Sequence, residues 1–126
     1  DMISYVDACP KYVELHVEGK DYILVHAGFN PEKPLIEQSE EECVWMRDWF
    51  YMSPGMENKF IIFGHTPTPH LHGKPCYDPW IDPVYKDKMG IDGGLGSYED
   101  GQLNCICLNH QTLPVLGKKD VEGEVL

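Results

Sequence analysis

The sequence predicts an α/β or α+β domain in which a mixed β-sheet carries a layer of helix. Two short apolar runs, residues 22–25 and 60–63, are rich in β-branched and aromatic side chains and have the length of buried strands. A segment after Ser39 has the signals of an amphipathic helix. Because strands that alternate with helix and long loops are typical of layered domains, these features favour a mixed sheet with helix on it.

The length and charge of the chain limit the functions to be considered. With 126 residues and 42% hydrophobic content, the chain is long enough for one domain and too short for two. We expect the domain over residues 1–117 and a charged tail over residues 118–126. A net charge of −11 argues against binding to nucleic acid or an anionic membrane, since phosphates are bound chiefly by Lys and Arg. A phosphorylated substrate remains compatible, because bound divalent ions can reverse the local field.

The cysteines and the apolar runs indicate the compartment. None of the five cysteines forms a Cys-x-x-Cys pair, which favours neither a disulfide framework nor a thiolate zinc site. No apolar run has the length of a membrane span, and the N-terminus has no basic region followed by an apolar one. We therefore expect a cytoplasmic protein. The start at Asp1, without an initiator Met, is typical of a fragment or a processed product.

The first elements expected are a short helix and a β-hairpin. Residues 2–9 fit the end of a helix that stops before Pro10. Residues 12–17 alternate between apolar and polar side chains, and a second strand covers residues 22–26, with Gly19 in the turn between them.

The expected helix begins with a capping box. Ser39 is followed three residues later by Glu42, and acidic residues fill the first turn, where the helix dipole favours them. The pattern predicts a helix that continues through Phe50 and ends before Ser53.

Two features of this helix bear on function. Trp45, Trp49 and Met52 recur with helical spacing, which predicts a stripe packed into the core. Arg47 has two interpretations: it is solvated or paired with a neighbouring acid such as Asp48, or it binds a phosphate, for which guanidinium is the best matched side chain.

The second half of the chain is predicted to contain shorter strands. Residues 70–85 are Pro-rich and indicate an irregular surface loop. A buried strand is expected at residues 88–92, and a tight turn at 93–96. Residues 102–108 alternate as a strand does, and residues 112–116 fit a final edge strand.

Two histidines at strand ends are the candidate metal ligands. His26 follows the apolar run 22–25, and His65 follows the run 60–63. In α/β proteins, residues at the carboxyl ends of strands face the crevice in which ligands lie. Neutral imidazole binds Mn, Fe and Zn, and Gly28 and Gly64 beside the two histidines permit close approach. Hydrogen-bonded histidines without a metal are the alternative for either one, but the repeated arrangement favours a shared metal site.

A second histidine cluster offers another alternative. His70 and His72 lie shortly after His65 in the Pro-rich segment. Their spacing matches no recurring zinc pattern, so a separate zinc site there is the less favoured interpretation.

Several short motifs of the sequence resemble those of a known protein family. Four motifs, residues 24–28 with Pro31, 45–47, 63–67 and 91–94, occur in the order found in the C-terminal half of the calcineurin-like metallophosphoesterases. The branch that they resemble contains bacterial and phage serine/threonine protein phosphatases and symmetrical diadenosine tetraphosphate hydrolases. The resemblance covers most of the chain, from about Tyr12 to Leu108.

The resemblance implies a role for three residues. The family's histidines at the positions of His26 and His65 bind the second metal of a two-metal centre, and its arginine at the position of Arg47 contacts the substrate phosphate. The cofactors implied are two divalent ions, Mn, Fe or Zn, that activate a hydroxide and neutralise the phosphoryl oxygens. The implied substrates are a phosphorylated protein or a dinucleoside polyphosphate.

The chain departs from the family in three ways. Asp92 is followed by Gly-Gly-Leu instead of the common Thr-Gly-Ala, so we assign it a structural role only. Pro67 stands where other branches carry a second histidine, which favours the protein-phosphatase branch. The family's N-terminal motifs, which supply the remaining metal ligands and the general acid, are missing, so we assign no catalytic residue to this chain.

The missing motifs determine what the chain is expected to do by itself. The resemblance implies one sheet and its helix layer from the family's four-layer αββα sandwich. The face that meets the absent half should expose apolar surface, so association with that half or with a second copy is expected. The fragment by itself should be inactive as a phosphatase. The alternative function is a non-enzymatic module that binds a partner or a single metal.

Overall fold

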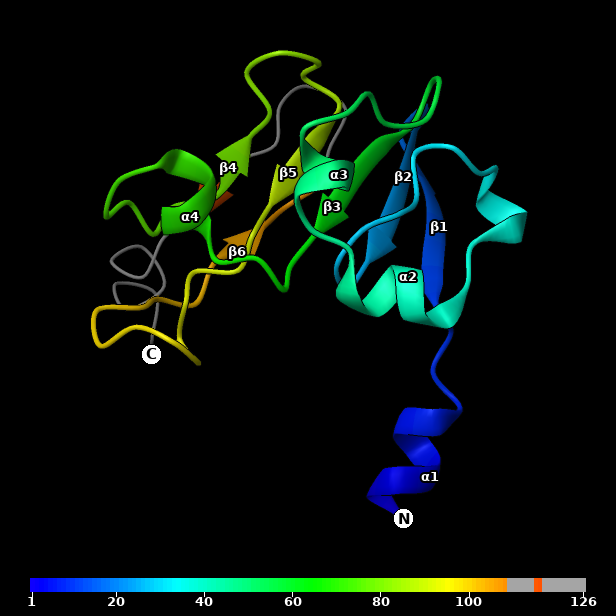
Figure 1. Ribbon diagram of the computed structural model, residues 1–126, viewed down its shortest axis with the longest axis horizontal. Helices are drawn as coiled ribbons and strands as arrows, with labels where there is room; N and C mark the ends of the chain where they lie inside the picture. Colours follow the sequence, from blue (N-terminus) through cyan, green and yellow to red (C-terminus); the bar gives the residue numbers. More distant parts are fainter. Residues whose placement is uncertain (109–114, 117–126) are drawn as a thin grey trace.

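A five-stranded mixed sheet forms the centre of the molecule. The computed structural model describes residues 1–108 and 115–116. The strands lie in the order β1-β2-β3-β5-β4, in which β2, β3 and β5 are parallel and the outer strands β1 and β4 are antiparallel to their neighbours (Figure 1). These strands are β1 (Tyr12–Val17), β2 (Lys20–Val25), β3 (Phe60–Phe63), β4 (Trp80–Ile81) and β5 (Lys88–Gly90).

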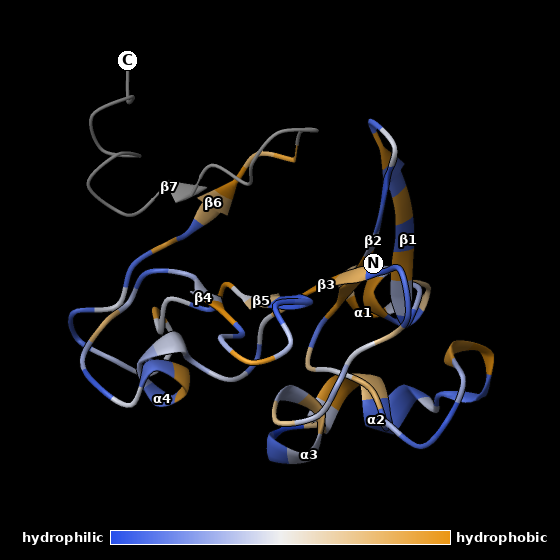
Figure 2. Ribbon diagram, turned by 90° about the horizontal axis from the view of Figure 1, so that it is seen from above, coloured by the Kyte–Doolittle hydropathy of each residue, from blue (hydrophilic) through white to orange (hydrophobic). Residues whose placement is uncertain are grey.

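The helices lie on one face of this sheet. Figure 2 shows α2, α3 and α4 on one side and β6 on the other. Odd-numbered residues of β2 and β3 pack beneath the helices, because successive side chains of a strand point to opposite faces. That cluster contains Ile23, Val25, Phe29, Cys43, Phe50, Ile61 and Phe63. The helices are α1 (Met2–Asp7), α2 (Glu40–Trp45), α3 (Asp48–Tyr51) and α4 (Thr68–His72), with a 3₁₀ turn η1 (Leu35–Glu37).

The other face of the sheet has its own apolar cluster. Tyr22, Phe60, Ile62 and Met89 are buried there. Ile106 of β6 (Cys105–Ile106) and Leu108 pack against this cluster, while Cys105 and Cys107 are exposed. The alternation expected for residues 102–108 is therefore confirmed, although the ladder formed with β7 (Val115–Leu116) is shorter than expected. Residues 112–114 of the expected final strand and the tail from 118 onward lie outside the described residues.

The predicted fold class is confirmed as a mixed sheet with helices. The hairpin, the strand over residues 60–63 and the strand beginning at Lys88 occur where the apolar patterns predict them. Glu18 and Gly19 form the hairpin turn with φ of 47° and 85°, values that suit glycine at the second position.

The prediction of one continuous helix from Ser39 to Phe50 is wrong. The capping box forms as expected between Ser39 and Glu42, but α2 ends at Trp45 and α3 begins at Asp48. Met46 takes an extended backbone with ψ of 141°, and Arg47 has φ −133° and ψ −119°. The chain turns at this point, and Phe50 reaches the rings of Phe29 and Phe63 in the core.

The break in the helix also overturns the predicted core stripe. Trp45, Trp49 and Met52 are 65%, 48% and 71% exposed. Once two residues between the helices leave the helical conformation, helical spacing no longer places these side chains on one face. Cys43 and Phe50 fill the core instead.

The prediction of an irregular loop over residues 70–85 is only partly correct. Pro67 leads into α4, which ends at Gly73 in the left-handed conformation with φ of 70°. Further along, β4 pairs antiparallel with β5 through Trp80↔Gly90 and Ile81↔Met89. Pro79 precedes this short strand at the sheet edge, a position that tolerates proline.

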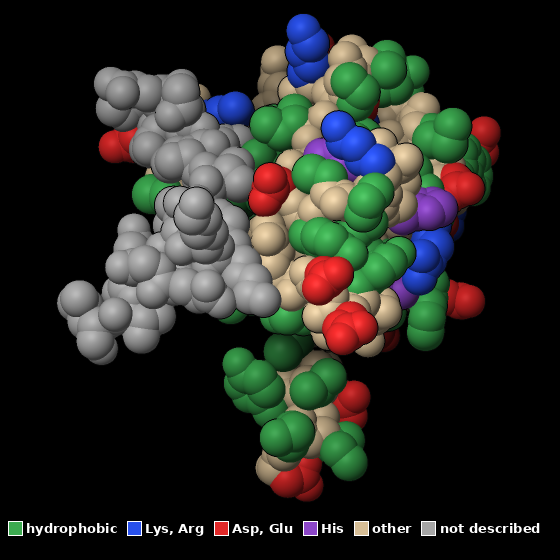
Figure 3. Space-filling model, turned by 90° about the vertical axis from the view of Figure 1, so that its left-hand side faces the viewer, with side chains coloured by type: hydrophobic (Ala, Val, Ile, Leu, Met, Phe, Trp, Pro, Cys, Tyr) green, Lys and Arg blue, Asp and Glu red, His purple; other side chains and the backbone are tan. Residues whose placement is uncertain are grey.

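The N-terminal helix α1 stands away from the sheet. It has no buried residue, and Met2, Ile3, Tyr5 and Val6 are 61–80% exposed. Figure 3 shows this segment below the body of the molecule with hydrophobic side chains around it. Within residues 1–108, no helix is long and apolar enough to cross a membrane.

Candidate metal centre

The parallel pairing of β2 and β3 brings the two predicted ligands together. Val25 is in register with Phe63, so His26 and His65 follow two neighbouring strand ends at the same edge of the sheet. The backbone N–H of Gly64 donates to the His26 carbonyl at 2.8 Å and fixes the two segments side by side. A Cβ on Gly64 would lie 3.5 Å from that carbonyl, so the glycine permits the approach without being strictly required.

The two imidazole rings face each other through specific nitrogens. His26 Nε2 lies 3.2 Å from His65 Nδ1, and the ring centroids are 5.0 Å apart. Two nitrogens bound to one ion at about 2.0–2.1 Å, with about 90–110° between the bonds, lie about 2.8–3.4 Å apart. The spacing in this structure fits two ligands of one ion, and it equally fits the alternative of a direct hydrogen bond between the two rings.

His65 is held in an uncommon state. Its backbone lies in the left-handed region with φ of 68°, a conformation that disfavours a side chain with a Cβ. Its other ring nitrogen, Nε2, is buried and has no hydrogen-bond partner among the described residues. Backbone strain and an unpaired buried polar atom at one residue are typical of functional sites.

The surroundings of His65 keep its ring neutral. Burial lowers the pKa of His65, and the positive charge of Arg47 and the electrostatic interaction with the neighbouring His26 lower it further, against a smaller opposite effect of Asp92. Neutral imidazole is the form that binds a metal ion. His65 is therefore available as a ligand at neutral pH.

Arg47 lies at the same site. It occupies the turn between α2 and α3, its side chain is exposed, and its charge acts on His65. No hydrogen bond or ion pair holds its guanidinium among the residues that the structure describes, so the alternative of pairing with Asp48 is not observed. His26 and His65 are thus brought into contact, and Arg47 lies near enough for its charge to act on His65.

Trp45 lies beside His65, although the helical spacing predicted it in the core. Its ring meets the His65 ring edge-on, with centroids 5.5 Å apart and planes at 87°. Predicted as core, Trp45 instead covers one side of the imidazole while remaining largely exposed. Its position two residues before Arg47 was the only signal in the sequence that could have placed it here.

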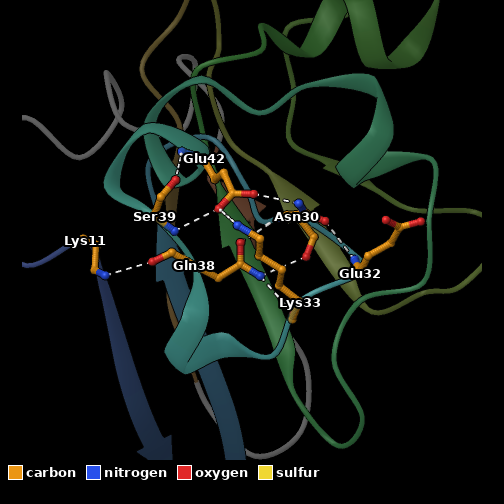
Figure 4. A network of polar contacts seen from close by, with 7 residues as sticks. All are labelled: Lys11, Asn30, Glu32, Lys33, Gln38, Ser39 and Glu42. Atoms are coloured by element: carbon orange, nitrogen blue, oxygen red, sulfur yellow. Dashed lines mark hydrogen bonds and ion pairs between the residues drawn. The ribbon is translucent and has the colours of Figure 1, made fainter.

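A buried amide organises the loop that follows His26. The Gln38 side chain is 1% exposed. Its Nε2 donates to the carbonyls of Asn30 and Lys33, and its Oε1 accepts from the Asn30 N–H (Figure 4). Lys11 donates to the Gln38 carbonyl at 2.8 Å, which ties the start of the hairpin to the same loop.

Glu42 connects this loop to α2. Its carboxylate accepts from the Ser39 N–H, from Lys33 Nζ at 2.9 Å and from Asn30 Nδ2 at 2.7 Å (Figure 4). These bonds, the one from the Ser39 backbone first, lower the pKa of Glu42 to about 2. Together with the bond from Ala27 N–H to the Cys43 carbonyl at 2.8 Å, they fix the segment after His26 against the helix that carries Trp45.

The remaining candidates lie apart from the pair. His70 Nε2 contacts the Tyr51 hydroxyl at 3.1 Å, and His72 Nε2 contacts the Asp78 carbonyl at 2.9 Å. Residues two apart on a helix do not face each other, so α4 does not present a histidine pair to one ion. Asp92 Oδ1 accepts from the Gly94 N–H at 2.9 Å and shapes the turn that follows, in agreement with a structural role.

The number of ligands is smaller than a complete site needs. Among residues 1–108, no three His, Cys, Asp or Glu side chains lie close enough to hold a metal ion. Structural and catalytic zinc sites use three or four protein ligands. His26 and His65 by themselves therefore provide fewer ligands than such a site uses.

Comparisons with known proteins do not identify a family. No protein-family model matches the chain, and the searches of curated proteins and of solved structures give no match.

Proposed function

We propose that this chain supplies the second-metal histidines of a metal-dependent phosphoesterase. The observation that carries the proposal is the 3.2 Å separation of His26 Nε2 and His65 Nδ1, which matches two ligands on one ion. The order of motifs in the sequence supports the same reaction class, with a phosphoprotein or a dinucleoside polyphosphate as substrate. Two ions, Mn, Fe or Zn, would complete the centre, and when bound they supply charge neutralisation and an activated water.

The residues of this chain would have three roles at the centre: metal binding, phosphate binding and shielding from water. His26 and His65 hold one ion, and the lowered pKa of His65 keeps its ring unprotonated for that purpose. Arg47, exposed and without an ion-pair partner in the described structure, binds the phosphoryl oxygens of the substrate. Trp45 shields one side of the His65 ring from water.

The other half of the centre would come from outside residues 1–126. The further ligands, the bridging carboxylate and the general acid belong to the family motifs that this sequence lacks. We therefore expect the 126-residue chain to bind a divalent ion more weakly than a complete site does, and to turn over no phosphate ester by itself.

Metal binding tests the histidine pair directly. We would titrate the chain with Zn²⁺ and Mn²⁺ and follow the histidine ring nitrogens by NMR. Zn²⁺ should shift Nε2 of His26 and Nδ1 of His65, and His65→Ala should abolish the shift of His26 Nε2. His16, an exposed strand histidine bonded to Asp21, is the matched control, and His16→Ala should leave both shifts unchanged. A shift of His26 Nε2 in His65→Ala as large as in the wild type would contradict the proposed pair.

Phosphatase activity tests the reaction class. Hydrolysis of p-nitrophenyl phosphate with Mn²⁺ should be absent for this chain and present for a longer protein that carries the missing motifs. In that longer protein, His65→Ala should remove turnover. Undiminished turnover in His65→Ala would contradict the assignment of a phosphoesterase centre to this histidine pair.

A non-enzymatic module is the second candidate. It is favoured by the presence of only two suitable ligands among the described residues. Under this alternative the chain binds a partner or one ion, and no extension of it hydrolyses a phosphate ester. The activity assay on the longer protein therefore separates the two.

A further inference from the structure

A pocket separate from the histidine pair lies between α3, α4 and β4. It has a volume of about 460 Å³, and neither His26 nor His65 lines it. Figure 1 shows α4 beside β4, with α3 over the middle of the sheet near β3 and β5. Its polar and aromatic lining comes from Asp48, Tyr51, His70, Trp80, Asp82 and Tyr85.

The aromatic walls of the pocket are held in a fixed arrangement. The Tyr51 ring meets Trp80 edge-on with centroids 6.3 Å apart, and it meets His70 in the same manner at 6.3 Å. Tyr85 is 43% exposed, and Lys88 Nζ lies 5.2 Å from its ring centroid, so one face of the ring already meets a cation while its exposed part borders the pocket. Aromatic faces attract cations and pack well against the hydrocarbon part of a ligand.

The charge of the pocket is negative. Its two carboxylates belong to Asp48 and Asp82. Asp82 is already paired, since Lys88 Nζ lies 2.8 Å from its Oδ2. Asp48 accepts from the Tyr51 hydroxyl but has no cationic partner in the part of the chain that the structure describes.

A hydrogen-bond chain orients the Asp48 carboxylate. His70 Nε2 lies 3.1 Å from the Tyr51 hydroxyl, which in turn donates to Asp48 Oδ1. Burial, the hydrogen bond to Asp48 and the charge of Asp48 raise the pKa of Tyr51, so its hydroxyl remains a donor. One oxygen of Asp48 is thus engaged, and the other has no hydrogen-bond partner among the described residues and is free for a ligand.

We propose that this pocket binds an organic cation, a guanidinium or alkylammonium group on a short hydrocarbon chain, with Asp48 as its counter-ion. Trp80 and Tyr85 contact the hydrocarbon part and the charged head. An anionic ligand would meet the unpaired Asp48, and a hard divalent ion would find too few free oxygen ligands. The cation is supplied either by a free diamine or by a basic side chain of a peptide.

NMR titration of the 126-residue chain tests the pocket. The probes are agmatine and the blocked peptide acetyl-Gly-Arg-Gly-amide, with the citrulline peptide as the uncharged isostere. The indole N–H of Trp80, assigned with Trp80→Phe, should shift in a saturable manner with the charged probes and not with citrulline. Asp48→Asn should weaken binding about ten-fold, as expected for the loss of a charge-assisted contact.

The control removes a charge elsewhere. Glu99 is exposed and does not line the pocket, so Glu99→Gln should leave the affinity within about two-fold, as surface changes usually do. Agmatine that binds at least as tightly as the arginine peptide would support a free cation as the ligand, and tighter binding of the peptide would support a basic side chain. Equal binding of the citrulline peptide, or unchanged binding in Asp48→Asn, would overturn the proposal.

Discussion

The polar groups at the two ends of the parallel strands differ in how completely their hydrogen bonds are satisfied. At the amino end of β5, Lys88 is fully buried, and its ammonium donates to Ser53 O, Asp82 Oδ2 and Asp87 Oδ1 at 2.7–2.8 Å. At the carboxyl end of β3, His65 has a strained backbone and a buried nitrogen without a partner. A lysine has three donors, so Lys88 has no capacity left for chemistry. In His65 the nitrogen without a partner is Nε2, whereas Nδ1 faces His26, so the described residues leave one polar atom of this buried ring unsatisfied.

The acceptors around Lys88 are satisfied as completely as the lysine is. Asp82 Oδ1 accepts from the Val84 N–H at 2.9 Å, and Asp87 Oδ2 accepts from the Gly55 N–H at 2.7 Å. The cluster therefore joins the loop after α3 to the loop between β4 and β5. The comparison teaches that burial of a charged group does not by itself indicate function, whereas an incomplete set of partners does.

Removing the lysine should cause the largest loss of stability. Lys88→Met leaves the buried Asp82 and the partly exposed Asp87 without their cation, and breaking a buried ion pair on one side costs about 3–5 kcal/mol. Urea unfolding followed by circular dichroism measures this loss. Lys74→Met is the exposed control and should stay within about 0.5 kcal/mol. A loss below about 1 kcal/mol in Lys88→Met would contradict the structural role of the cluster.

The pH dependence of the same cluster has a defined sign. Burial has the largest single effect on Asp82 and raises its pKa, but the hydrogen bond and charge of Lys88 and the backbone N–H groups of Val84 and Tyr85 together outweigh it and lower the pKa below 3.8. A carboxyl with a lowered pKa in the folded state stabilises the fold above its ordinary pKa and loses that contribution as pH falls through the folded value. The difference in stability between the wild type and Lys88→Met should therefore shrink as pH falls below about 4.

At the opposite end, a substitution should separate stability from binding. His65→Gly relieves a left-handed backbone that costs a residue with a Cβ about 1–2 kcal/mol, while it adds chain entropy to the unfolded state. We expect the free energy of unfolding to change by no more than about 1 kcal/mol, in either direction, and Zn²⁺ binding to be lost.

A matched control for backbone strain is available. Lys86 also has positive φ, 57°, and is exposed, so Lys86→Gly should show a similar stability change while Zn²⁺ binding persists. If His65→Gly lost more than about 2 kcal/mol and Lys86→Gly did not, the imidazole would be a structural group and the contrast between the two ends would fail.

The segment that joins the two ends should give the smallest effect. Met52 lies between Arg47 and Ser53, and it is 71% exposed although the helical pattern had placed it in the core. Met52→Ala should change the free energy of unfolding by about 0.5 kcal/mol or less, as surface substitutions usually do. Phe50→Ala, two residues earlier and 2% exposed, should cost about 3–5 kcal/mol in the same urea experiment. Similar losses of unfolding free energy in Met52→Ala and Phe50→Ala would support the packed stripe that the helical spacing predicted.

The sequence predicted the parts that depend on short apolar runs. Residues 22–25 and 60–63 form strands because their side chains are buried on both faces, and parallel pairing then brings His26 and His65 to one edge. The site could be predicted because this pairing needs no detail of the loops. The pairing of the two rings through Nε2 and Nδ1 could not, since it depends on the left-handed backbone of His65.

The errors arise where tertiary contacts outweigh local signals. A capping box and helical spacing predict a continuous helix, yet Phe50 packs on Phe29 and Phe63 only when the chain turns at Met46 and Arg47. Strand β4 was not predicted, because an apolar pattern of two residues beside Pro79 is too short to be distinguished from a loop.

The turn between α2 and α3 has a consequence for protein engineering. A programme that sought thermostability by raising helix propensity over residues 40–51 would replace the poorer helix formers beside Met46 and Arg47, such as Val44 and Asp48, and fuse the two helices. The fused helix would gain intrachain bonds but would point residue 47 in a new direction and pull Trp45 off the His65 ring. Screening for heat resistance would thus favour variants in which the proposed centre no longer assembles, so such a screen needs a metal-binding readout beside it.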